Sequence, residues 1–99
     1  MPRRLDYTDA ALRDIEAAFQ WLSQPGSGTR ARRRIRAIRT AIDTLIDHPC
    51  LHPVNPDSRR RELSCEGHRI IYSVVPDTGD NATAGNVVVL RVFGPGQIR

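Results

Sequence analysis

The stretch "HRIIYSVV", residues 68–75, decides the fold, because β-branched residues and Tyr72 dominate it, as is typical of a strand. Side chains alternate between the two faces of a strand. Ile70, Tyr72 and Val74 are therefore expected on one face. The other face should carry Arg69, Ile71, Ser73 and Val75.

Further strands are expected on both sides of this stretch. "RRREL" at 59–63 leads into it through the turn "CEGH", and "NVVVLRVF" at 86–93 follows the exposed loop "DTGDNATAG". "RRLDY" at 3–7 can add one more strand. In 86–93 the alternation separates Val88, Leu90 and Val92 from Val87, Val89, Arg91 and Phe93.

Two helices are expected between the first strand and the others. Thr8 or Asp9 can cap the first helix, and the loop "QPGSG" should end it near Ser23 and turn the second helix back antiparallel. The apolar positions of the first helix are Leu12, Ile15, Phe19 and Leu22. Those of the second are Ala31, Ile35, Ile38, Ile42, Leu45 and Ile46. Pro49 disfavours helical geometry at His48 and so ends the second helix.

These elements predict a single α+β domain over residues 1–99 with the order β-α-α-β-β-β. A helical hairpin packs on one face of a small, mostly antiparallel sheet, and the other face is open or partly open. A chain of 99 residues has room for one hydrophobic core.

The second helix carries an unusual charge pattern. "TRARRRIRAIRT" at 29–40 contains six arginines and no acidic residue. Helical geometry places Arg32, Arg36 and Arg39 on one flank, Arg33 opposite the apolar seam, and Arg30 and Arg34 on the other flank. Like charges four residues apart, and cations at the positive end of the helix dipole, destabilise the helix. A solvated face, an acidic protein partner and direct nucleic-acid contact are three interpretations of this pattern.

Several classes of function have little support in the sequence. His48, Cys50, His52 and Cys65 lack the spacing of a zinc site, and no phosphate-binding glycine motif occurs. No apolar run reaches the ~20 residues of a membrane span. We therefore expect a cytoplasmic protein with reduced cysteines, no cofactor, no metal and no membrane contact. All fifteen basic residues are arginine and the net charge is +4, so acidic partners are favoured.

The order of several short strings resembles the RelE/ParE superfamily of bacterial toxins from toxin–antitoxin systems. The strings are "LIDHP", "RRREL", "GHRIIYSV" and the closing "VVVLRVFGPGQIR". The resemblance extends from "RRLDYTDAALRDIEAAF" to the C-terminus. It implies a toxin that an antitoxin with an acidic tail binds and neutralises in a hetero-oligomer.

Two mechanisms occur in that superfamily. RelE-like members cleave mRNA on the ribosome with basic residues on the open sheet face and usually an aromatic residue or His near the C-terminus, whereas ParE-like members are described as poisoning DNA gyrase. After the last strand this chain reads "GPGQIR", where a RelE-like enzyme continues to its Tyr. Gly94 stands where His is common in the ParE-like ending. Arginine is a poor proton acceptor, which further disfavours cleavage.

We therefore predict a ParE-like toxin that inhibits gyrase by binding, with a RelE-like ribosome-dependent ribonuclease as the alternative. A nucleic-acid-binding module is a third interpretation, although only five aromatic residues are present for base stacking. The predicted target-binding residues are Arg61, Arg69, Arg91, Gln97 and Arg99. The predicted antitoxin-binding residues are Arg32, Arg36 and Arg39. For the ribonuclease the catalytic candidates are His68, Arg69 and Arg91.

Overall fold

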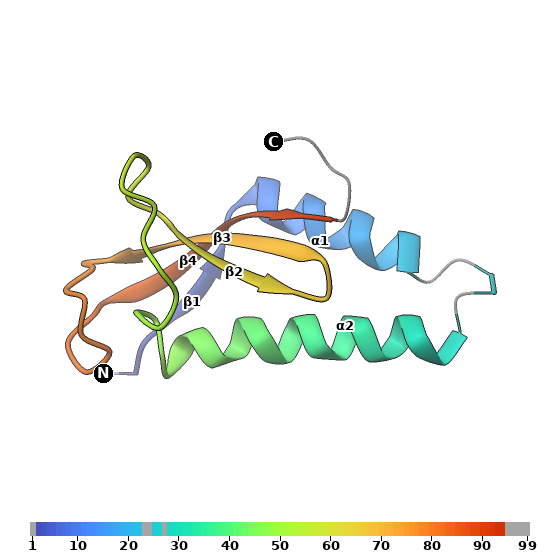
Figure 1. The fold of residues 1–99 in the computed structure, drawn as a ribbon, viewed down its shortest axis with the longest axis horizontal. Coiled ribbons are helices and arrows are strands. Elements are labelled where there is room, and N and C mark those ends of the chain that lie inside the picture. The colour runs from blue at the N-terminus through green and yellow to red at the C-terminus, as the bar shows by residue number, and fades with distance from the viewer. Residues whose placement is uncertain (1, 23–24, 27, 95–99) are drawn as a thin grey trace.

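The chain forms two helices and a four-stranded sheet in a computed structural model that describes residues 2–22, 25–26 and 28–94 (Figure 1). The elements are β1 (Leu5–Tyr7), α1 (Asp9–Leu22), α2 (Gly28–Asp43), the 3₁₀ turn η1 (Thr44–Ile46), β2 (Arg61–Cys65), β3 (His68–Val75) and β4 (Asn86–Phe93). The predicted β-α-α-β-β-β order is confirmed.

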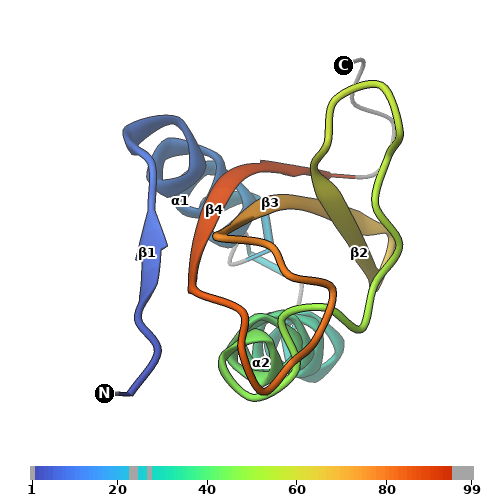
Figure 2. The ribbon, with the colours of Figure 1, turned by 90° about the vertical axis from the view of Figure 1, so that its left-hand side faces the viewer.

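The sheet has the strand order β1-β4-β3-β2. β1 runs parallel to β4, and the other two pairings are antiparallel, so the sheet is mostly antiparallel as predicted. Figure 2 shows the sheet curving over α2, with α1 beside β1 and β4. One face of the sheet is therefore covered by α2, and the opposite face of β2, β3 and β4 carries no helix.

The β2–β3 hairpin closes through a two-residue turn at Glu66 and Gly67, as "CEGH" predicts. Both residues have positive φ, 52° and 77°, and Cys65 pairs with His68 across the turn. Two consecutive residues with positive φ give the turn whose twist matches that of antiparallel strands. The turn thus fixes which β2 residue lies opposite each β3 residue.

The core lies between the sheet and the two helices, with Ala11 of α1 and Ile38 and Ile42 of α2 buried in it. Ile70, Tyr72 and Val74 are buried, so the alternation predicted for β3 is confirmed. In β4 the alternation is interrupted, because the register with β3 shifts between Ile71 and Tyr72. The buried set of β4 is Val87, Val89 and Val92, which combines members of the two sets that strict alternation separates. A bulge changes the phase of a strand, and this moves the side chains beyond it to the other face.

Thr8 caps α1, because its hydroxyl accepts a hydrogen bond from the Ala11 amide at 3.0 Å. The α-helix α2 ends at Asp43, earlier than the proline signal predicts. The chain tightens there into η1, which still places Leu45 in the core with no exposed surface. No helix within the described residues is long and apolar enough to cross a membrane.

The N-terminal strand is held by Arg3, whose guanidinium bridges several backbone carbonyls. It donates to Gly85 at 2.8 Å, to Ala84 at 2.9 Å and also to Ile46. One side chain therefore joins β1 to η1 and to the end of the β3–β4 loop. This loop, predicted as exposed, also buries Ala84.

Gly85 lies where two segments of backbone approach closely, and a larger residue should destabilise the fold. A Cβ at this position would overlap the Val75 carbonyl oxygen and the Pro76 ring. We expect Gly85→Ala to lower the free energy of unfolding by about 3 kcal/mol, measured by urea titration. In Gly79→Ala the added Cβ meets nothing within 4 Å at φ +77°, so only the backbone strain of about 1 kcal/mol is expected. Equal losses in the two variants would contradict the steric explanation.

Candidate functional site

The helix-free face of the sheet brings two predicted arginines together. Arg91 pairs with Ile71 and Phe93 pairs with Arg69 across the β3–β4 ladder. Paired residues project from the same face, so these four side chains form one group, which we call the open-face patch. Arg69 and Arg91 occupy diagonal positions of this patch, on neighbouring strands.

Each arginine of the open-face patch is bound by a carboxylate. Arg69 Nη2 donates to Glu62 Oε2 at 2.6 Å. Arg91 makes two hydrogen bonds to Asp14, at 2.8 Å and 3.1 Å, and its guanidinium lies 4.8 Å from the Phe93 ring centroid. The patch therefore presents charged groups of both signs around Ile71 and Phe93, rather than free cations.

Asp14 joins α1 to the edge of β4. β1 pairs with β4 only as far as Val89, and beyond that point Asp14 Oδ2 accepts the Val92 amide hydrogen at 2.9 Å. Burial alone would raise the pKa of Asp14, but the hydrogen bonds from Arg91 and the Val92 amide outweigh it and lower the pKa. Asp14 thus satisfies an edge amide and orients Arg91. No sequence signal connects two residues so far apart in the chain.

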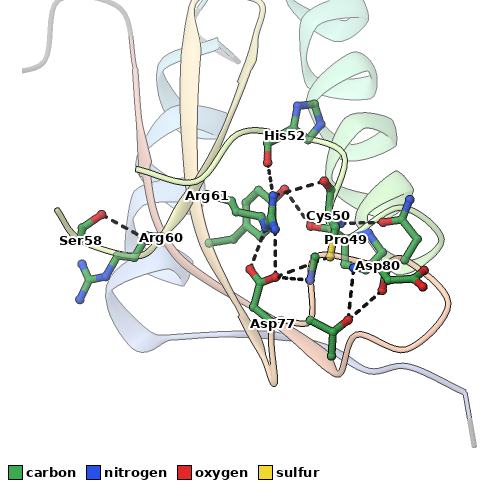
Figure 3. A network of polar contacts seen from close by, with 12 residues as sticks. Pro49, Cys50, His52, Ser58, Arg60, Arg61, Asp77 and Asp80 are labelled. Atoms are coloured by element: carbon green, nitrogen blue, oxygen red, sulfur yellow. Dashed lines mark hydrogen bonds and ion pairs between the residues drawn. The ribbon is translucent and has the colours of Figure 1, made fainter. Parts of the chain in front are cut away.

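Arg61 does not belong to the open face, which corrects its predicted place on the target-binding surface. Arg61 is only 6% exposed. Figure 3 shows its guanidinium held between Asp77 and the segment around Cys50 and His52. Two hydrogen bonds of 2.8 Å and 2.9 Å join it to Asp77, and two more reach the carbonyls of Cys50 and His52 at 3.2 Å and 2.5 Å. Arg61 therefore holds two loops together and is not available to a partner.

Other polar groups complete this internal network. The buried Tyr72 hydroxyl donates to the Pro49 carbonyl at 3.1 Å, and burial raises the pKa of Tyr72 to about 12. Asn81 accepts the Cys50 amide hydrogen at 2.7 Å. Cys50 and Cys65 are free thiols. Among the residues that the structure describes, no three His, Cys, Asp or Glu side chains are grouped so that they could hold a metal ion.

The Arg61–Asp77 pair predicts a pH dependence of stability. The hydrogen bond from Arg61 lowers the pKa of Asp77 below its usual 3.8. A carboxyl group whose pKa is lower in the folded state stabilises the protein above its unfolded pKa, and this contribution is lost as pH falls through the folded pKa. Between about pH 6 and pH 3, Asp77→Asn should therefore lose less unfolding free energy than the native chain. Asp57→Asn, at an exposed turn, is the matched control, because none of the described ion pairs involves Asp57.

The remaining sequence candidates lie in different places. His68 is 3% exposed and lies on the helix-covered face with Ile70, so it does not share a surface with Arg69 and Arg91. Its Nδ1 lies 3.1 Å from the Glu66 carbonyl oxygen. Gln97 and Arg99 lie outside the described residues.

A second charged surface lies on α2. Within the described part of the chain, none of its six arginines forms an ion pair with a carboxylate. All are exposed except Arg34, which is half-buried. We call this group the α2 arginine array: Arg30, Arg32, Arg33, Arg34, Arg36 and Arg39. In contrast to the arginines of the open-face patch, these cations are available to an anionic partner.

An apolar groove of about 360 Å³ runs between α1 and α2 beside the array. Its lining residues are Tyr7, Leu12, Ile15, Phe19, Ile38, Arg39, Ile42 and Asp43. Leu12, predicted as part of the apolar seam of α1, is 52% exposed at this groove. The pattern of apolar residues on α1 indicated the helix correctly, but it could not distinguish buried positions from positions that line a groove.

Comparison with known proteins identifies the family. The family described as the ParE toxin of type II toxin–antitoxin system, parDE, matches residues 5–97. The chain belongs to this family. None of the curated proteins matches it. A solved structure described as the chromosomal ParDE TA system from P. aeruginosa is similar, with a TM-score of 0.68 and 15% sequence identity over 95% of this chain and 97% of that chain. At this identity the likeness establishes the fold of the ParE-family toxin.

In this ParE-family toxin the open-face patch has little capacity for proton transfer. Arg69 and Arg91 are poor proton acceptors. Tyr72 and His68 project from the other face of the same strand, into the core. The patch can bind a surface with complementary charges and an apolar centre, and the α2 arginine array with its groove can bind an acidic, partly apolar segment.

Proposed function

We propose that this ParE-family toxin acts by binding DNA gyrase through its open-face patch, and that it does not cleave RNA. The observation that carries the proposal is that Arg69 and Arg91 each hold a carboxylate, from Glu62 and Asp14. A phosphate would have to compete with these carboxylates for the two guanidinium groups. A protein surface can instead fit the alternating charges around Phe93 and Ile71.

Chemical requirements support binding over cleavage. Attack by a ribose 2′-hydroxyl needs a proton acceptor, a proton donor for the leaving oxygen and cations near the phosphorane. Tyr72 has a pKa near 12 and bonds inward to the Pro49 carbonyl, and His68 is buried. Neither group reaches a substrate on the open face. Binding to a protein target requires no proton transfer, so the open-face patch alone is sufficient for it.

A gyrase assay tests this mechanism. The purified chain without antitoxin should block supercoiling and increase gyrase-dependent DNA cleavage. Arg69→Gln and Arg91→Gln should weaken both effects. Arg4→Gln removes an exposed arginine directly before β1 and should leave both effects unchanged. Unaltered supercoiling and cleavage at a large excess of folded protein would reject gyrase as the target.

The co-location of Arg69 and Arg91 also favours one alternative, a RelE-like ribonuclease that acts on mRNA in the ribosome. Both arginines lie on the face that such enzymes use. In that case translated mRNA should be cut at codon positions, and Arg69→Gln or Arg91→Gln should abolish the cuts. Cuts that persist in both variants would reject this alternative.

We further propose that an antitoxin with an acidic segment neutralises the toxin in a cytoplasmic hetero-oligomer. Arg32, Arg36 and Arg39 follow at intervals of four and three residues, so they form one stripe along α2. Arg39 also lines the groove. An amphipathic segment can place apolar side chains in the groove and carboxylates on the stripe, where charge-assisted hydrogen bonds form.

A further inference from the structure

The positive charge of this protein is concentrated on one helix. Outside residues 30–39 the chain has nine arginines and eleven acidic residues, so this segment carries more than the whole net charge of +4. The arginines of the array lie within about three turns of helix, with no acidic residue in the first turn. The positive end of the helix dipole adds to the same field. Such a concentrated field attracts polyanions from a distance.

The array has two sides with different surroundings. Arg39 lines the apolar groove, and Arg32 and Arg36 continue its stripe along the helix, which suits a protein segment. Arg33 lies on the outward side of α2, Arg30 and Arg34 lie on the opposite flank, and none of the three lines the groove. We call these three the outer arginines. Thr29, one turn before Arg33, is exposed and polar, and the apolar neighbours Ala31 and Ala37 are small residues that are not exposed.

A surface of this composition fits a nucleic-acid backbone better than a second protein segment. Protein interfaces have an apolar centre with large side chains, and the described part of α2 exposes no large apolar side chain beside the outer arginines. Backbone binding to duplex DNA needs only clustered cations facing closely spaced phosphates, and the guanidinium group binds phosphate through two parallel hydrogen bonds. Base-stacking aromatic residues are not required for such contacts.

We propose that Arg30, Arg33 and Arg34 form a sequence-independent binding site for the phosphate backbone of duplex DNA. This site is separate from the open-face patch and from the stripe assigned to the antitoxin. A bound phosphate would also offset the electrostatic repulsion between Arg30 and Arg34, which lie one turn apart. The proposal does not depend on gyrase being the target, because it concerns the surface charge of α2 alone.

The test is binding of the full chain to a fluorescent duplex of about 20 base pairs and arbitrary sequence, between about 50 mM and 200 mM salt. The logarithm of the association constant should fall linearly with the logarithm of salt concentration. In the variant Arg30→Gln/Arg33→Gln/Arg34→Gln the magnitude of this slope should decrease by about 2.7, which is ~0.9 for each of three lost phosphate contacts. Glutamine keeps a similar helix propensity, so the fold should be retained.

The matched control removes the same charge elsewhere, through Arg4→Gln/Arg59→Gln/Arg60→Gln at three exposed positions. This variant should keep most of the slope. Equal slopes in the two variants would overturn the proposal, because net charge alone would then account for binding. No binding by the native chain at about 50 mM salt would overturn it as well. Poly-glutamate and unlabelled duplex are compared as competitors at equal concentrations of negative charge. If poly-glutamate displaces the fluorescent duplex at the lower concentration, the outer arginines bind an acidic protein instead.

Discussion

Replacing Arg61 with methionine should lower the free energy of unfolding by about 4 kcal/mol. The substitution leaves the Asp77 carboxylate and the carbonyls of Cys50 and His52 without their donor, in a site where Arg61 is only 6% exposed. The cost comes mainly from the two carbonyl oxygens, because an acceptor that loses its donor costs about 1–3 kcal/mol, whereas the Asp77 side chain is 24% exposed and partly solvated. Urea titration at neutral pH measures the effect.

The control for this prediction is Arg60→Met at the preceding position, where the side chain is exposed. It should change stability by less than about 0.5 kcal/mol. Arg61→Lys should also be destabilising, because lysine keeps the charge but cannot bond Asp77 and two carbonyls in one plane. A loss below about 1 kcal/mol for Arg61→Met would show that the network contributes little to stability.

Reversing the charge of Arg32, Arg36 and Arg39 to glutamate should weaken antitoxin binding by about 100-fold or more at low salt. The proposed stripe then repels the carboxylates that it should attract. Calorimetry or surface binding with the antitoxin measures the change. Added salt should reduce the difference between the native and reversed chains, since exposed charges are screened.

The matched control reverses the outer arginines Arg30, Arg33 and Arg34 on the same helix. It changes net charge by the same amount but lies away from the groove. It should weaken antitoxin binding much less while still reducing duplex binding. Equal effects of the two triple variants on antitoxin affinity would mean that the array attracts the antitoxin only through its total charge.

The fold was predictable because strong local patterns dominate it. The alternation at Ile70, Tyr72 and Val74 and the cap at Thr8 both lead to the observed elements. The positions of β4 that face the core were not predictable beyond the bulge. A bulge depends on how two strands pair, and the alternation of residues in the sequence does not indicate it. As a result, Arg91 and Phe93 project from the open face while Val87 and Val89 project into the core.

The site was predictable only in part. The sequence identified Arg69 and Arg91 as one surface, and the register places them on the same face. Their partners Glu62 and Asp14 decide how that surface behaves, and Asp14 is 77 residues from Arg91 in the chain. Arg61 illustrates the same difficulty, since "RRREL" offers three arginines and only tertiary contacts with Asp77 distinguish the buried one.

The most direct test of binding to gyrase as the toxic mechanism is induction of this chain alone in a bacterial host, with pulse labelling of DNA and protein synthesis during the first minutes. Binding to gyrase should produce an early DNA-damage response while translation continues. Immediate arrest of translation with cut mRNA would contradict it.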